Sequence, residues 1–148
     1  MLDPIKINVV KNCLQHFFET QIPPKSLKVS VYEEHWQLRI NIEDNAKLLA
    51  SITMVFHWPV VFLSGFKLEK PLLTISVIDF LYTTIEKAAN IFDHPILMAT
   101  ATAHSPIRPT LIDNDWTWLT GIKVPDGPEH VNMYYKNLEE EAKKPIDD

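Results

Sequence analysis

The histidines and the single cysteine are the side chains best suited to bind a metal ion, and their spacing argues against a metal site. The six histidines are spread along the chain, at positions 16, 35, 57, 94, 104 and 130. No two share an expected helix at the spacing of metal ligands, and no H-E-x-x-H pattern occurs. Cys13 has no second cysteine with which to bind zinc or form an internal disulfide. We therefore predict no metal and interpret the histidines as turn and capping residues.

Acidic side chains occur in neighbouring pairs that could act as a catalytic acid and base, but each pair falls in an expected turn. Glu33-Glu34 and Glu43-Asp44 lie where we expect hairpin turns, so solvated turn residues are the simpler interpretation. Asp113-Asn114-Asp115 resembles part of a calcium-binding loop but lacks the glycine and the distant glutamate of such a loop. No G-x-S-x-G nucleophile motif or Walker loop is present. These motifs predict no catalytic residue and no cofactor.

The composition limits the class of protein. A chain of 148 residues that is 46% hydrophobic can form one domain over residues 1–148, with only a frayed acidic C-terminal tail outside its core. A net charge of -5 and only two arginines, Arg39 and Arg108, argue against nucleic-acid binding. No apolar run is long enough to span a bilayer and no signal peptide is evident, so we expect a cytoplasmic protein without a membrane partner.

One long helix followed by one strand forms the centre of the expected fold. Ile78, Leu81, Ile85 and Ala88 recur at helical spacing, which predicts a helix that buries this face, with Leu81 and Ile85 fully enclosed. Pro71 suits the start, and Thr74 or Ser76 can cap the first turn. The sequence Asp93-His94-Pro95 ends the helix. The apolar run 96–103 that follows is typical of a strand covered on both faces.

The remaining segments predict an α+β domain. Asp3-Pro4 begins an N-terminal helix. Alternating residues between 27 and 66 predict three or four antiparallel strands. We expect a short helix over 110–120, ended by Gly121, and a last strand over 131–135. The expected architecture is a single antiparallel or mixed sheet flanked by helices.

Over residues 60–135 this order of elements resembles the GNAT acyltransferase superfamily. Leu119-Thr120-Gly121-Ile122, after Asp113-Asn114, is similar to the ending of the short helix in GNAT domains, above all in phage-encoded members. The resemblance implies an acyl-CoA substrate, Tyr134 or Tyr135 as general acid, and, more weakly, Glu33 or Glu34 as base. GNAT enzymes bind the pyrophosphate with a glycine-rich loop at the start of the central helix. Residues 66–72 contain no glycine and include Pro71, so we expect no tight acetyl-CoA binding.

We therefore interpret the chain as a non-catalytic module that binds a protein partner, with a phage or mobile-element origin suggested by the resemblance. The first alternative is a divergent GNAT-like acyltransferase that uses acyl-CoA. The second alternative, from the order of elements alone, is a secretion-chaperone-like or toxin-immunity protein. The oligomeric state stays open.

The expected binding site centres on Trp118. In a helix, residues two apart point about 200 degrees apart, so Trp116 and Trp118 face opposite ways. Trp116 shares the side of Leu119 and should be buried, which leaves Trp118 outside to anchor the partner. If the segment is a strand, both tryptophans share one face. We expect an acidic rim that favours a basic partner, formed by Asp113, Asp115, Asp126 and Glu129.

Overall fold

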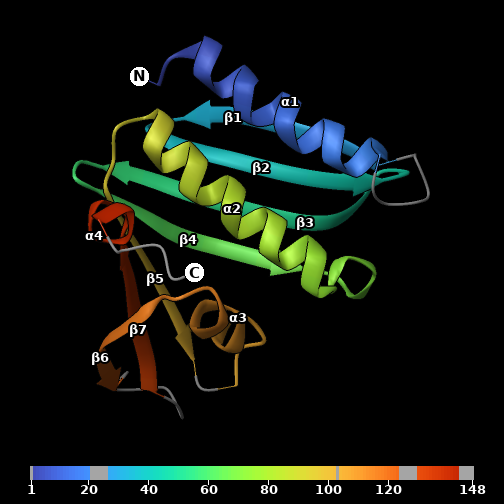
Figure 1. Ribbon diagram of the computed structural model, residues 1–148. Coiled ribbons are helices and arrows are strands. Elements are labelled where there is room, and N and C mark those ends of the chain that lie inside the picture. Colours follow the sequence, from blue (N-terminus) through green and yellow to red (C-terminus); the bar gives the residue numbers. More distant parts are fainter. Residues whose placement is uncertain (1, 21–26, 103, 124–129, 144–148) are drawn as a thin grey trace.

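The computed structural model describes residues 2–20, 27–102, 104–123 and 130–143 of the chain, and Figure 1 shows their arrangement. A single seven-stranded sheet runs in the order β1-β2-β3-β4-β5-β7-β6, with helices packed against it. The sheet is mixed, because β4 and β5 pair in parallel and the other described pairs are antiparallel. This confirms the expected α+β class. The elements in chain order are α1 (Pro4–Thr20), β1 (Leu27–Glu34), β2 (Gln37–Asp44), β3 (Lys47–His57), β4 (Val60–Leu68), η1 (Lys70–Leu72), α2 (Ile75–Ile91), β5 (Ile96–Thr102), α3 (Ile107–Asp113), β6 (Thr117–Lys123), β7 (His130–Asn137) and α4 (Leu138–Lys143).

Helices α1 and α2 lie across the same face of the sheet half formed by β1 to β4 (Figure 1). The predicted face of α2 is buried, and both Leu81 and Ile85 have no exposed surface. Thr74 caps the helix, since its hydroxyl oxygen accepts a hydrogen bond from the Val77 amide at 3.4 Å. Pro71 lies one turn earlier, within η1. Helical periodicity therefore located α2 correctly to within a few residues.

Strands β1 to β4 form an antiparallel meander whose buried residues alternate with more exposed ones. Leu38, Ile40 and Ile42 of β2 are at most 1% exposed and face the helices. Two-residue turns join the first three strands, with positive φ angles at His35, Trp36, Asn45 and Ala46. Positive φ at both turn residues is typical of tight hairpins that match the twist of the strands. The paired carboxylates, which we expected within the turns, are instead the last residues of β1 and β2, directly before the turns.

The parallel pair β4–β5 separates after its first four residue pairs. Val60 to Leu63 pair with Ile96 to Ala99, and β4 then continues to Leu68 without β5 beside it. The separation begins where β4 is bulged against β3, because Thr53 pairs with Gly65 while Met54 pairs with Leu63, which leaves Ser64 as the extra residue. A bulge bends its strand and strengthens the local twist. Figure 1 shows the result, with the tips of β4 and β5 pointing apart.

The C-terminal part differs from expectation. The segment expected as one helix over 110–120 is instead the short helix α3 followed by the strand β6. Asp115 has a positive φ angle of 66°, which stops the helix, and the β-branched Thr117, Thr120 and Ile122 favour the strand that pairs with β7. Leu119, expected to be buried, is 48% exposed.

Strand β5 also differs, because only one of its faces is covered. Leu97, Ala99 and Ala101 are buried, whereas Thr100 is exposed and Met98 only half-buried. Ala103, the last residue of the expected strand, lies outside the described residues. Among the helices that the structure describes, none combines the length and hydropathy needed to cross a bilayer.

Candidate functional site

A gap opens between β4 and β5 at the point where the two strands stop pairing. Beyond Leu63 and Ala99, β4 keeps β3 as its neighbour and β5 keeps β7, but the two strands no longer pair with each other. Each strand therefore presents backbone amide and carbonyl groups toward the gap. Such free edges can bind an extended ligand through main-chain hydrogen bonds.

Three cavities adjoin along this gap. The first, of about 330 Å³, lies at the end of β4 between the starts of α2 and α3, and its lining includes Phe66, Leu73, Ile78 and Ile107. The third, of about 130 Å³, shares Phe66 and Ile107 with the first. The second, of about 290 Å³, shares four lining residues with the third: Leu63, Ser64, Ala99 and Thr100. We refer to these three cavities together as the passage.

The passage leads to the sheet face that bears Met98, Thr100 and Met133, which we call the open face. Strand register places Thr100 beside Met133, and both line the second cavity together with Met98. Neither the second nor the third cavity has an ionisable side chain in its lining. The first cavity does, because Lys67 and Glu69 lie at its rim. The passage is therefore charged at its helix end and uncharged at its open-face end.

A buried tyrosine holds the wall of the first cavity. The hydroxyl of Tyr82 on α2 lies 2.8 Å from the Thr110 hydroxyl on α3, and its ring stacks on Phe66 at a centroid distance of 5.4 Å. Trp116 packs against the same ring edge-on, at 6.1 Å. Burial raises the pKa of Tyr82 to about 12, with the Thr110 hydrogen bond acting weakly in the opposite direction. Tyr82 thereby fixes α2, α3 and β4 relative to one another.

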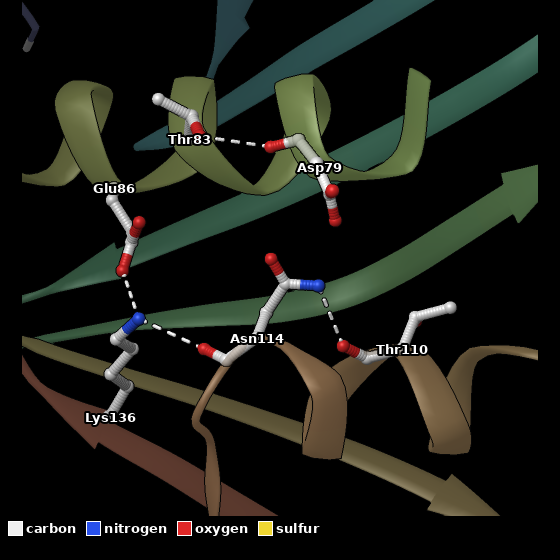
Figure 2. Close-up of polar contacts among 6 residues, drawn as sticks. All are labelled: Asp79, Thr83, Glu86, Thr110, Asn114 and Lys136. Carbon is white, nitrogen blue, oxygen red and sulfur yellow. Dashed lines mark hydrogen bonds and ion pairs between the residues drawn. The ribbon is translucent and has the colours of Figure 1, made fainter. Parts of the chain in front are cut away.

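A second polar connection joins the same helices to β7, as Figure 2 shows. Lys136 Nζ lies 2.5 Å from a carboxylate oxygen of Glu86 on α2 and donates to the Asn114 carbonyl oxygen, 2.9 Å away. The Asn114 side-chain amide donates in turn to the Thr110 carbonyl oxygen at 2.8 Å. Of these residues only Thr110 lines the passage, at the first cavity, and the others hold α2 and α3 in place on either side of it.

The two tyrosines implied by the GNAT resemblance lie on opposite faces of β7. Tyr134 is buried on the helix face, where its hydroxyl oxygen accepts a hydrogen bond from Arg108 Nε at 3.2 Å. Tyr135 pairs with Met98, so it lies on the open face beside the second cavity. Neither tyrosine lines the passage itself. Of the two, Tyr135 is on the face where the passage ends.

The other implied residues lie away from the passage. Glu33 and Glu34 are on β1, which β2 and β3 separate from β4. The Glu33 carboxylate accepts a hydrogen bond from the Leu2 amide, and Glu34 lies 3.8 Å from Arg39 in an exposed ion pair. These contacts give both carboxylates local structural roles, so neither is placed to act as a base on a ligand in the passage.

The predicted partner site falls on α3, β6 and the segment between them. Trp118 is 57% exposed and Trp116 4% exposed, as expected, but Trp118 belongs to a strand rather than a helix. Its indole Nε1 donates to the Asn132 side chain at 3.2 Å. Asp113 and Asp115 are exposed, while Asp126 and Glu129 lie outside the described residues. The acidic rim therefore stays a prediction.

The sequence matches no family model and no curated protein. The fold does match solved acetyltransferases. An acetyltransferase from Salmonella typhimurium that modifies the N-terminal serine of ribosomal protein L7/L12 gives a TM-score of 0.56 at 12% identity, over 69% of this chain and 64% of that chain. The microcin C7 self-immunity acetyltransferase MccE, solved with acetyl-CoA and AMP, gives 0.56 at 11% identity, over 69% and 61%. A probable GNAT-family acetyltransferase from Chromobacterium violaceum gives 0.59 at 5% identity, over 74% and 63%.

These matches show a GNAT-like fold, and the chain spans less than two thirds of the length of each of the three structures. They also correct the main interpretation of the sequence. A non-catalytic protein-binding module was expected, whereas the structures that share this fold are acetyltransferases. That interpretation rested too heavily on the missing glycines of one loop, and local residue patterns could not reveal the gap between β4 and β5.

Proposed function

We propose that this chain is an acyltransferase that binds a pantetheine thioester in the passage and transfers its acyl group to an amine. The passage between the separated strands β4 and β5 is the observation that carries this proposal. Pantetheine is narrow and extended and contains two amides, so it can pair with free strand edges on both sides of the gap. The names of the structural neighbours, which include an N-terminal serine acetyltransferase and a complex with acetyl-CoA, support the same chemistry.

The two ends of the passage suit different parts of the donor. The charged rim at Lys67 suits the phosphate end, and the uncharged second cavity suits the acyl group. On the open face the neutral amine attacks the thioester carbonyl carbon, the carbon–sulfur bond breaks, and the amine proton passes to water. Tyr135 is the proton donor closest in register to this cavity, and it would protonate the leaving sulfur and recover its proton from solvent.

The test uses a donor that has only the part expected inside the passage. S-acetylpantetheine binding is measured by calorimetry, and transfer to a peptide with a free N-terminal serine is measured by mass spectrometry. In the variant Ser64→Trp, an exposed residue that lines two of the cavities is enlarged, so the passage is filled without a change to the core. Ser30→Trp, on β1 at the far edge of the sheet, is the matched control.

We expect binding and transfer by the wild type and by Ser30→Trp, and loss of both by Ser64→Trp. Wild-type binding of S-acetylpantetheine that persists undiminished in Ser64→Trp would remove the passage from the proposal. Absence of binding and of transfer with every thioester offered would refute an acyltransferase.

A further inference from the structure

The end of the passage beside α2 is poorly suited to bind the nucleotide part of coenzyme A. On the premise of the proposed function, we infer that the acyl group arrives on the phosphopantetheine arm of a small acidic carrier protein rather than on coenzyme A. Three features of the described residues carry this inference. The backbone amides before α2 are largely hydrogen-bonded within the chain, the rim of the first cavity carries few charges, and exposed apolar side chains surround that rim.

The backbone amides that precede α2 are largely occupied by the chain itself. The Leu72 amide donates to the Glu69 carbonyl, that of Leu73 to Lys70, and that of Thr74 to Leu72, at 2.9 to 3.1 Å. Pro71 has no amide hydrogen. The Val77 and Ile78 amides donate to the Thr74 hydroxyl and carbonyl oxygens. A pyrophosphate group is held in other proteins by several free amides of such a turn, and here η1 has closed that turn.

The charge at the rim of the first cavity also suits an anion that carries fewer negative charges than coenzyme A. Lys67 and Glu69 line the first cavity, Lys70 follows Glu69 at the start of η1, and both lysines are exposed. Glu69, which lies between the lysines in the sequence, cancels part of their charge. Coenzyme A brings about four negative charges in its pyrophosphate and 3′-phosphate groups, whereas the phosphodiester of a carrier-bound arm brings about one. Two lysines offset by one glutamate can balance the charge of the phosphodiester but not that of coenzyme A.

The surroundings of the rim are apolar and exposed. Leu73, which is 43% exposed, lies just before α2, and Ile75, which is 81% exposed, is the first residue of the helix. Leu48, 46% exposed, lines a small hollow together with Lys67 and Glu69, so it borders the same rim. Apolar side chains flanked by lysines are complementary to a partner that presents apolar residues within an acidic surface. A carrier protein of this chemistry would place its phosphopantetheine arm at the first cavity.

The experiment compares three donors of the same acetyl group at equal concentration: an acyl carrier protein loaded with acetyl-phosphopantetheine, acetyl-CoA and S-acetylpantetheine. Transfer to the N-terminal serine peptide is the readout. We expect the loaded carrier protein to be used about tenfold or more faster than acetyl-CoA. The double variant Lys70→Glu/Ile75→Glu should lower the rate with the carrier protein, relative to that with S-acetylpantetheine, by about tenfold or more. Lys28→Glu, an exposed charge reversal on β1, should leave that ratio unchanged.

The outcomes separate this inference from the function on which it rests. Faster use of acetyl-CoA than of the carrier protein, or a carrier-to-pantetheine ratio that the double variant leaves unaltered, would overturn the carrier inference and keep the acyltransferase. No transfer from any of the three donors would instead overturn the acyltransferase. The melting temperature of each variant, measured beside the wild type, shows that a lost rate does not come from unfolding.

Discussion

The Tyr82 hydroxyl offers the sharpest test of how the wall of the first cavity is built. Tyr82→Phe removes only this hydroxyl, and the Thr110 hydroxyl can still donate to the Ile107 carbonyl oxygen at 2.5 Å. The Thr110 hydroxyl therefore keeps a hydrogen bond and the Phe side chain has no polar group to satisfy. The free energy of unfolding at pH 7 should fall by about 1 kcal/mol. For a chain of this size that corresponds to roughly 2–4 °C in melting temperature.

The raised pKa makes the effect of this substitution depend on pH. The phenol ionises near pH 10 in the unfolded chain and near pH 12 in the folded one. A group whose folded pKa is raised contributes stability that is present below the unfolded pKa and is lost as the pH rises toward the folded pKa. At pH 11 the wild type should therefore have lost about 1.4 kcal/mol through Tyr82, and the Phe variant should have lost nothing by this route.

The two proteins should consequently exchange their order of stability near pH 11. Urea unfolding of wild type and Tyr82→Phe at pH 7 and pH 11 measures this directly, because the lysines and other tyrosines titrate in both proteins and cancel in the difference. A stability difference that stays constant between these pH values would show that the Tyr82 hydroxyl is solvated rather than buried against Thr110, and the described wall would be wrong.

Three further predictions concern the core, the ion pair and the chemistry. Leu81→Ala, at a site with no exposed surface, should cost about 2–5 kcal/mol by urea unfolding, and a cost below about 1 kcal/mol would contradict the packing of α2. Lys136→Met should cost about 1–2 kcal/mol, a moderate value because Glu86 is 26% exposed, and adding Glu86→Gln should recover part of it if the pair is as described. Tyr135→Phe should lower transfer by about a hundredfold with S-acetylpantetheine affinity unchanged, and an equal rate would exclude Tyr135 as the proton donor.

The sequence predicted those parts of the fold in which local pattern and tertiary packing agree. The central helix buries the same face that its 3.6-residue period marks, and Thr74 caps it. The segment 117–123 has no such agreement, because all its residues are exposed and its strand forms only through pairing with β7. An edge strand without a buried face shows no alternation of apolar and polar residues, so the sequence alone does not distinguish it from the helix predicted over 110–120.

The passage could not be predicted from the sequence, for a different reason. It depends on which strands are neighbours and on where β4 and β5 stop pairing, and neither fact is local to any segment. The only local signal is the run of small residues at the separation, Ser64-Gly65 on β4 and Ala99-Thr100 on β5. Small side chains leave room between strands, but the same residues occur in many ordinary strands.

The loop before α2 connects the sequence and the structure most directly. Its lack of glycine and the presence of Pro71 led us to expect neither acyl-CoA binding nor catalysis, two conclusions that the structure separates. In the proposed function the loop would contact the phosphate end of the donor, whereas transfer would occur at the other end of the passage, beside Met98 and Met133. A closed amide turn can therefore alter the identity of the donor while the gap between β4 and β5 is retained. For this reason a pantetheine thioester without a nucleotide is the donor with which activity should be sought first.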